Sequence, residues 1–513
     1  MNLADDLLRR SREVPDRPGL FYEDGRSWTF REWDEQSGRY AAALRSLGVA
    51  EGDRIGLFVP NTPELAFLLY AAWRIGAVAV PMSPLYNADE LSASVDKTTP
   101  TLLVGHQVLA EAFSAADAQG ATRVAVGGSI DGCADLDALV AGTDPFAGCV
   151  EDPDDAVILF TGGTTGQPKA AVMQHRGVLD TVATMVKASK GGAEGPYPAA
   201  ADGTPPNLIA WPLFHGGGQQ PLLVALHAGR SVVLMHRFNV PLFAEMVVRH
   251  RLDNVFLAPT MIYDVVSSTG DIDLSSLRSV LSAGQRLEPD LQRRFELRFG
   301  VPILQTYGST EIGHVAGWTG ADLKAGRWRP GAVGRLYPGV EVEVRDDDGS
   351  VLPAGSSGEI WVRSKVTRGY ADSEGSDLID EAGWVRSGDV GTVDDDNVLT
   401  LVGRRREMIK TGGFQIWPGE VEDAVREHPG VADVAVVGVP DDRMGEIPKA
   451  FVVVSDDSTT DRNVLSDDII AFARDRLAHF KAPRALEFID ELPRTEAGKV
   501  AKGELLRRAG TTS

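Results

Sequence analysis

The chain has 513 residues, of which 43% are hydrophobic and 24% charged, a balance typical of folded globular proteins and unlike that of disordered chains. Its formal net charge of −22 argues against a nucleic-acid partner, because nucleic-acid-binding domains carry a basic face. No apolar run approaches the roughly 20 residues that span a bilayer, and the N-terminus carries acid where a signal peptide carries base, so we expect a cytoplasmic protein without an integral membrane segment.

The length predicts two or more domains, since single hydrophobic cores stop growing well below this size. Only two cysteines occur, Cys133 and Cys149, and they form no CxxC pair. That pattern indicates two free thiols rather than a zinc site or a disulfide framework.

Short apolar runs alternate with helical patterns from residue 54 onwards. Residues 54–59 and 77–80 are predicted strands on either side of a predicted helix over 64–75. Further predicted strands, most of them separated by helical patterns, lie at 156–160, 208–211, 231–234, 254–257, 279–282 and 302–305. Continuous apolar strands between helices predict an α/β fold with parallel-rich sheets flanked by helices, in which ligands gather at the carboxyl ends of strands.

The pattern changes after about residue 330. Apolar runs at 341–344, 358–362 and 398–401, divided by Gly- and Asp-rich turns, predict a β-rich subdomain. The last hundred or so residues combine predicted strands at 431–439 and 449–454 with predicted helices at 420–428 and 466–477. We therefore predict a large N-terminal domain over residues 1–402 and a small α+β domain over residues 403–513.

A Gly- and Thr-rich string, Phe160-Thr161-Gly162-Gly163-Thr164-Thr165-Gly166-Gln167-Pro168-Lys169, follows a predicted strand and precedes a helical stretch. Glycines let the backbone approach a polyphosphate, amides and hydroxyls donate to its oxygens, and the lysine adds positive charge. The string is not a Walker A loop, because Ala170 stands where that motif needs Ser or Thr. The residues predicted to hold nucleotide phosphates are Thr161, Gly163, Thr164, Thr165, Gly166 and Lys169.

Five more motifs follow in a fixed order: Tyr307-Gly308-Ser309-Thr310-Glu311, Ser387-Gly388-Asp389, Gly403-Arg404-Arg405-Arg406-Glu407, Lys410-Thr411-Gly412-Gly413 and Pro493-Arg494-Thr495-Glu496-Ala497-Gly498-Lys499. With this set the chain resembles, over nearly its whole length, the adenylate-forming enzymes, which include acyl-CoA synthetases, beetle luciferases and the adenylation domains of peptide synthetases. The resemblance implies an ATP-dependent carboxylic acid:CoA ligase. Acid and ATP give acyl-AMP and pyrophosphate, and acyl-AMP and CoA then give acyl-CoA and AMP, with Mg2+ required.

The resemblance also implies roles around the nucleotide. Tyr307 would stack on adenine, Thr310 would donate to the α-phosphate, and Glu311 would hold Mg2+, which prefers oxygen ligands. Asp389 would accept the ribose hydroxyls, with Arg404 in support. The remaining residues implied at the ATP site are Gly284, Gln285, Thr306, Gly308 and Ser309.

Lys499 would be the catalytic cation that bridges the carboxylate and the α-phosphate during adenylation, where positive charge stabilises the transition state most. The resemblance then implies that the small domain rotates about Arg406, which removes Lys499 and brings up a thioester-forming face. Lys410, Gly412 and Gly413 would bind CoA on that face.

The segment Pro212-Leu213-Phe214-His215-Gly216-Gly217-Gly218 is similar to the stretch that borders the acyl pocket in this family. No aspartate occurs between residues 213 and 219, which disfavours an amino acid as the substrate. Consecutive glycines predict a roomy pocket lined by Phe214, His215, Gly216, Gly217, Gly218 and Gly313. His215 would gate access of the carboxylate and the thiol, although a hydrogen-bonded structural histidine is the alternative.

Other readings stay open at this point. The acceptor could be a separate carrier protein or oxygen instead of CoA, and a non-catalytic nucleotide-binding module is a reading of another class. Lys499, Thr310 and Glu311 together argue against that module, and the missing Lys-Ser/Thr pair argues against a P-loop kinase or ATPase. The sequence leaves open a homodimer.

Overall fold

The structure is a computed structural model that describes residues 1–161, 169–193, 195–371, 378–411, 414–455, 462–495 and 499–510. The described residues form two compact units. The first takes its residues from 1–161, 169–341 and 362–386, and the second from 342–361 and 387–510. The domain boundary predicted between residues 402 and 403 stays a prediction.

An eight-stranded sheet of the first unit has the order β19-β9-β8-β4-β3-β5-β6-β7. Its strands are β3 (Arg54–Phe58), β4 (Val78–Pro81), β5 (Leu102–His106), β6 (Thr122–Val126), β7 (Ala134–Asp135), β8 (Asp155–Thr161), β9 (Lys169–Gln174) and β19 (Thr367–Tyr370). The strands from β8 through β7 in this order are parallel, while β9 is antiparallel to both of its neighbours.

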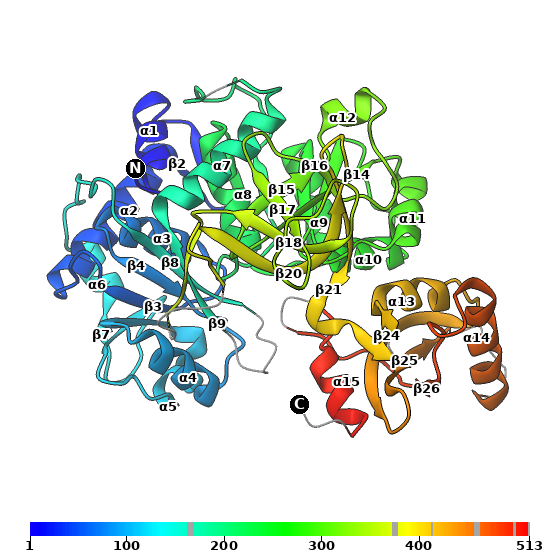
Figure 1. Ribbon diagram of the computed structural model, residues 1–513. Helices are drawn as coiled ribbons and strands as arrows, with labels where there is room; N and C mark the ends of the chain where they lie inside the picture. The colour runs from blue at the N-terminus through cyan, green and yellow to red at the C-terminus, as the bar shows by residue number, and fades with distance from the viewer. Residues whose placement is uncertain are drawn as a thin grey trace. The chain divides into compact units, whose positions relative to one another are not determined.

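Two further sets of strands belong to the first unit (Figure 1). One has the order β10-β11-β1-β2, with β1 (Pro18–Tyr22), β2 (Ser27–Thr29), β10 (Asn207–Ile209) and β11 (Val232–Leu234). The other runs β12-β13-β14-β15-β16, with β12 (Asn254–Leu257), β13 (Ser279–Ser282), β14 (Ile303–Ser309), β15 (Gly313–Gly317) and β16 (Gly334–Leu336). The predicted strands at 254–257 and 279–282 therefore have the observed bounds.

Helices cover these sheets. They are α1 (Asp5–Glu13), α2 (Phe30–Ser46), α3 (Pro63–Arg74), α4 (Ala88–Thr98), α5 (Ala110–Ala115), α6 (Leu136–Ala141), α7 (His175–Ser189), α8 (Gly216–His227), α9 (Val240–His250), α10 (Pro259–Ser267), α11 (Pro289–Phe299) and α12 (Gly320–Lys324), with a 3-10 turn η1 (Gln107–Leu109). Most of α3 is apolar and all but one of its residues are buried, and it begins with Pro63, whose fixed φ suits a first helical position. Parallel strands covered by helices confirm the predicted α/β fold class.

The second unit is described by itself. Most of its strands form the order β21-β20-β18-β17 or the order β23-β22-β25-β24, and β26 pairs with β25. These strands are β17 (Glu341–Arg345), β18 (Gly358–Arg363), β20 (Trp384–Val393), β21 (Val398–Arg404), β22 (Ile409–Thr411), β23 (Phe414–Ile416), β24 (Val431–Asp441), β25 (Gly445–Val454) and β26 (Ala485–Phe488). Its helices are η2 (Arg405–Glu407), α13 (Pro418–Arg426), α14 (Arg462–Arg476) and α15 (Lys502–Arg508).

One local prediction was wrong. The segment after the Gly- and Thr-rich string was expected to lead into a helix, but Lys169–Gln174 forms β9, and α7 begins only at His175. β9 lies between β8 and β19, with Thr161 opposite Lys169 and Ala171 opposite both Leu159 and Tyr370. Backbone pairing on both edges outweighs the helix propensity of its alanines.

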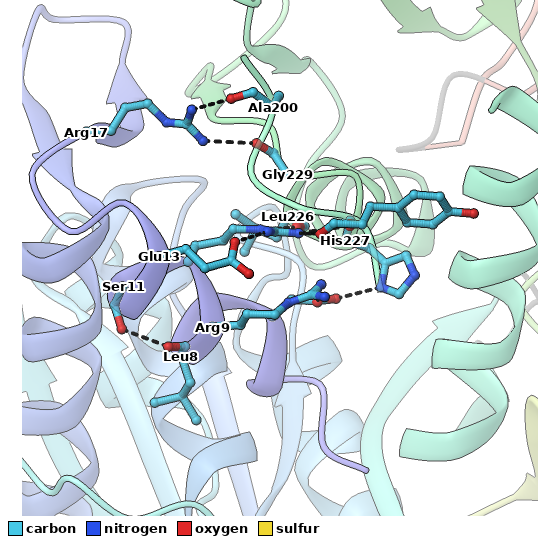
Figure 2. Close-up of polar contacts among 12 residues, drawn as sticks. Leu8, Arg9, Ser11, Glu13, Arg17, Ala200, Leu226, His227 and Gly229 are labelled. Carbon is cyan, nitrogen blue, oxygen red and sulfur yellow. Dashed lines mark hydrogen bonds and ion pairs between the residues drawn. The ribbon is translucent and has the colours of Figure 1, made fainter. Parts of the chain in front are cut away.

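A buried guanidinium fixes the C-terminal end of α8. Arg10 of α1 is fully buried and donates to the carbonyl oxygens of Leu226 at 3.0 Å, Tyr197 at 2.8 Å and His227 at 3.1 Å. Glu13 forms an ion pair with the same guanidinium. Figure 2 shows Leu226 and His227 in this region. A cation that donates to the last carbonyls of a helix also interacts favourably with the helix dipole.

Both cysteines are free and half-buried. Burial raises the pKa of the Cys149 thiol to about 12, and the neighbouring Asp5 carboxylate adds to the shift. Burial also raises the pKa of Cys133, against an opposing effect of Arg123. None of the helices in the described part of the chain has the length and apolar character needed to cross a bilayer.

Replacing Arg10 with methionine should lower the free energy of unfolding by about 3–5 kcal/mol, because the change leaves the Glu13 carboxylate and the carbonyl groups of Tyr197 and His227 without their donor. Urea denaturation followed by tryptophan fluorescence measures this. The matched control is Arg293→Met, which removes an exposed ion pair with Asp290 and should cost no more than about 1 kcal/mol. Equal losses of unfolding free energy in the two variants would contradict the role of Arg10 in fixing the C-terminal end of α8.

Candidate active site

The connection between β10 and α8 carries the predicted acyl-pocket segment, and buried amides hold it in place. The backbone N–H of Leu213 donates to Asn61 Oδ1 at 2.8 Å, and Gln219 Nε2 donates to the Leu213 carbonyl at 2.8 Å. Asn61 Nδ2 in turn donates to the carbonyl of Met235, after β11, at 2.6 Å. Because these groups are buried, their hydrogen bonds compete little with water and fix the path of the chain.

Trp211 packs against this segment at positions where only glycine fits. A Cβ on Gly217 would lie 2.5 Å from Trp211 Cε3, and a Cβ on Gly284 would lie 2.8 Å from Trp211 Cη2. The ring of Trp211 also stacks on His215 and on Phe256, with centroid distances of 5.7 Å in both cases. The glycines predicted to enlarge the pocket at 216–218 therefore also let α8 approach this indole. Sequence reasoning missed Trp211, because only the folded contacts reveal it.

His215 is the N-cap residue of α8. Its Nδ1 accepts a hydrogen bond from the Gly217 backbone N–H at 2.9 Å, so the ring is oriented by the helix that it starts. The first helical residue, Gly216, also lies near Thr310, since a Cβ there would be 3.8 Å from Thr310 Oγ1. The structure thus brings together His215, Gly216 and Thr310, with the half-buried Phe214 adjacent in sequence.

The predicted adenine-binding segment forms the end of β14. Thr306 and Tyr307 are buried, and Thr306 Oγ1 donates to the carbonyl of Ala316 and is hydrogen-bonded to Tyr337 Oη, both at 3.0 Å. A bulge follows, after which Gly308 pairs with His314 and Ser309 with Gly313. Gly313 has a φ of +71°, and a Cβ there would lie 2.6 Å from Thr181 Oγ1, so glycine is required on two counts.

Tyr370 links two of the predicted site residues and was not identified from the sequence. Its hydroxyl donates to Glu311 Oε1 at 3.4 Å, and Lys169 Nζ lies 4.8 Å from the centre of its ring. Ser309 Oγ donates to the other carboxylate oxygen of Glu311 at 2.8 Å. Lys169 and Glu311, which are far apart in sequence, therefore both contact one aromatic side chain.

The surroundings of Glu311 fit the predicted Mg2+ site. Among the described residues, no group of three or more His, Cys, Asp or Glu side chains is placed to hold a metal ion by itself. Mg2+ in nucleotide sites is bound by one or two carboxylates together with substrate phosphates. A single carboxylate oriented by Ser309 and Tyr370 matches that donor set.

The second unit holds the other predicted residues. Arg404 Nε lies 3.1 Å from Asp389 Oδ1, and the two residues are opposite each other in β20 and β21. Arg406 is exposed in η2, and Lys410 is exposed in β22, where its N–H donates to Glu446 Oε2 at 2.8 Å. Lys499 is half-buried, and its backbone N–H and carbonyl bond to Thr495 at 3.2 and 2.7 Å.

Several predicted residues lie outside the described part of the chain, namely Gly163, Thr164, Thr165, Gly166, Gly412 and Gly413. Thr161 borders the first of these segments, where its Oγ1 donates to the Lys169 carbonyl at 3.5 Å. Of the two predicted residues after β13, Gly284 abuts Trp211, and Gln285 is half-buried.

A cavity of about 430 Å³ lies away from all of these residues. It is lined by Trp28, Gln36, Arg39, Tyr40, Glu64, Phe67, Asp137, Val140 and Ala141, none of which the sequence predicted at a site.

Comparison with known proteins identifies the family. The family model of the AMP-binding enzymes matches residues 7–371, and that of the AMP-binding enzyme C-terminal domain matches residues 420–499. The chain belongs to the AMP-binding enzyme family. The prediction of an adenylate-forming enzyme of the acyl-CoA synthetase branch, an AMP-forming ligase that uses ATP, Mg2+ and CoA, is confirmed at the level of this family and its named members.

Two relatives in this family cover nearly the whole chain. 4-Coumarate–CoA ligase 3 of Oryza sativa subsp. japonica is 32% identical over 530 residues, which cover 99% of this chain and 92% of the relative. Feruloyl-CoA synthase of Amycolatopsis sp is 33% identical over 509 residues, which cover 98% of each chain.

Two solved structures share the fold over their full length. ATP-bound MatB from Rhodopseudomonas palustris is 27% identical with a TM-score of 0.87, and the comparison covers 99% of both chains. The amide bond synthetase McbA from Marinactinospora thermotolerans is 30% identical with a TM-score of 0.85, again over 99% of both chains. These likenesses confirm the predicted arrangement of a large N-terminal and a small C-terminal domain.

Gly217→Ala should lower kcat/KM for the acid at least tenfold and the free energy of unfolding by about 1–3 kcal/mol, because the added methyl group overpacks against Trp211. Steady-state kinetics and thermal denaturation check this. Gly320→Ala is the control, since Gly320 begins a helix with no atom within 4 Å of the added Cβ, and this change should leave both quantities unaltered. Wild-type kinetics in Gly217→Ala would contradict a role for this contact in the acid site.

Proposed function

We propose that the enzyme activates an aromatic carboxylic acid and transfers its acyl group to coenzyme A. A carboxylate oxygen attacks the α-phosphorus of ATP, and the bond to pyrophosphate breaks. The thiol sulfur of CoA then attacks the acyl carbon of the adenylate, the bond to AMP breaks, and the thiol proton passes to solvent. The products are acyl-CoA, AMP and pyrophosphate.

The observation that carries the aromatic specificity is the stacking of Trp211 on His215 and on Phe256, next to α8 residues that have no side chains. Flat aromatic surfaces and glycine-lined walls suit a planar substrate, since aromatic groups pack in offset stacks. The names of the two relatives support the same choice, because coumarate and ferulate are both arylpropenoic acids.

In the proposed adenylation step, the side chains of the first unit act on the nucleotide. Tyr307 stacks on adenine, Thr310 and Lys169 contact phosphate oxygens, and Glu311 holds Mg2+, which neutralises phosphate charge. Ser309 and Tyr370 keep the carboxylate of Glu311 oriented through the hydrogen bonds described above. A preoriented ligand is favourable because little conformational entropy is lost when the metal binds.

The second unit supplies the remaining proposed groups. Asp389 accepts the ribose hydroxyls with support from its ion pair with Arg404, and Lys499 neutralises charge shared by the carboxylate and the α-phosphate. We propose that the part of the second unit after Arg406 then turns about this residue, so that Lys410, Gly412 and Gly413 guide the thiol. The next residue, Glu407, is paired with Lys502 at 3.0 Å, which supports a pivot that ends before residue 407.

A second acceptor class has specific support. The likeness to an amide bond synthetase, at 30% identity over 99% of the chain, favours an amine as the alternative nucleophile for the same adenylate. A separate carrier protein is a third possible acceptor. Supplying CoA, simple amines and a phosphopantetheinylated carrier protein in competition decides which product forms.

We expect AMP and pyrophosphate as products, a strict requirement for Mg2+, and faster turnover of aromatic than of straight-chain acids. Chromatography of the nucleotides, a coupled pyrophosphate assay and mass spectrometry of the thioester measure these. Acid-dependent release of ADP and phosphate would overturn the reaction class. A preference for straight-chain acids would overturn the aromatic specificity alone.

Lys499→Ala should slow adenylation by about 10²–10³-fold, the cost of removing one preorganised charge-stabilising donor. The thiol step should be little affected, because the proposed rotation has removed Lys499 from the reacting atoms by then. One assay supplies acid and ATP, and the other supplies presynthesised acyl-adenylate and CoA. Equal loss in both assays, with an unchanged melting temperature, would contradict the two-conformation assignment.

A further inference from the structure

Among the residues that the structure describes, a buried histidine near the proposed acid site finds no hydrogen-bond partner for either ring nitrogen. His314 lies in β15 with only 8% of its surface exposed, and neither Nδ1 nor Nε2 reaches a partner within the described part of the chain. A neutral imidazole carries one N–H donor and one acceptor nitrogen. Burial of both without partners is unfavourable, so the arrangement calls for a group that these residues do not provide.

The position of His314 connects it to the proposed acid site. β14 and β15 are joined by residues 310–312, and Thr310 in this connection lies next to Gly216, the first residue of α8. A Cβ atom added to Gly313 would point toward Thr181 of α7 and Val366. Because successive side chains of a strand point to opposite faces, the imidazole of His314 projects from the face of this hairpin that Gly313 does not occupy.

The residue paired with His314 on β14 offers no side chain to the ring. Gly308 is directly opposite His314 in the antiparallel pair of β14 and β15. Directly opposed residues place their side chains on the same face, and glycine has none to offer.

Other buried polar atoms in segments that meet at Trp211 have no partner among the described residues, namely Trp211 Nε1 and Ser282 Oγ. Ser282 ends β13, and Gly284, two residues further along the chain, abuts Trp211. Three elements of the first unit thus present unpaired polar atoms in or next to the proposed acid site.

The charge state of His314 restricts the chemistry of its partner. Burial lowers the pKa of His314 to about 4, so the ring is neutral near pH 7. A neutral imidazole is best paired with a neutral group that can both accept and donate a hydrogen bond. A hydroxyl meets this condition, because its oxygen accepts from an N–H and its proton can be donated to the bare nitrogen.

We propose that His314 is a specificity-determining residue of the acid site, and that its imidazole hydrogen-bonds a hydroxyl group that the acid carries away from its carboxyl. This inference rests on the proposed function and deepens it, since it selects hydroxylated acids among aromatic ones. His314 acts on substrate choice and takes no part in the bonds that form or break.

The test compares kcat/KM, from pyrophosphate release, for pairs of aromatic acids that differ by one ring hydroxyl placed at each position in turn. The wild-type enzyme should favour one hydroxylated acid over its parent by about 10–100-fold, the range set by leaving a buried polar group unpaired. His314→Phe should abolish this preference while it retains activity on the parent acid. His314→Gln, which keeps a donor and an acceptor, should retain part of it.

Tyr337→Phe is the matched control, because it removes a buried hydroxyl that is already paired with Thr306 and should leave the preference unchanged. A wild-type enzyme without any preference, or a preference that persists in a folded His314→Phe variant, overturns the inference and leaves the ligase function intact. Failure of every acid to release pyrophosphate overturns the proposed function, and the inference with it.

A second measurement uses wild-type protein alone, so it does not depend on whether a His314 variant folds. In wild-type protein labelled with ¹⁵N-histidine, the favoured hydroxylated acid should shift one pair of imidazole nitrogen resonances that the parent acid leaves unshifted. Shifts of equal size with both acids would show that His314 does not contact the hydroxyl, and would overturn the inference.

Discussion

The close approach of an indole to two glycines governs the geometry of the proposed acid site. Because Gly217 and Gly284 have no Cβ, Trp211 can lie against the first turn of α8 and the turn after β13 at once. Overlap with any larger side chain would force the helix away, since packed interiors do not absorb an extra methyl group without displacement. His215, which caps α8, takes its position from this contact, and the contact also sets where Gly216 lies beside Thr310.

Polar groups then hold α8 at both ends. Asn61 and Gln219 fix the turn before its N-terminus, and Arg10 binds the carbonyls at its C-terminus. The N-terminal helix α1 thereby acts on a segment more than 200 residues later, through a guanidinium that is fully buried. Such a charge is stable in an interior only when its donors are all engaged, so the contact orients α8 as well as stabilising it.

Much of the architecture could be predicted because its signals are local. Apolar runs between helical patterns predicted the observed bounds of strands such as 254–257, and the ordered motifs predicted the family. The failure at Lys169–Gln174 shows the limit, since that strand depends on neighbours supplied by β8 and by β19 nearly 200 residues on. The roles of Trp211, Tyr370 and His314 were not predicted for a related reason. The role of an aromatic or imidazole ring depends on which groups it contacts in the folded chain, and the sequence does not show those contacts.

The two native thiols have a practical consequence for following motion in solution. Alkylating reagents attack the thiolate, and with a pKa of about 12 Cys149 holds almost none of it at neutral pH, while the pKa of Cys133 is also raised. A cysteine introduced at an exposed surface position would therefore react with a maleimide dye well before Cys149. Donor and acceptor dyes placed in this way on the two units would report the proposed relative movement during turnover, without prior removal of Cys149.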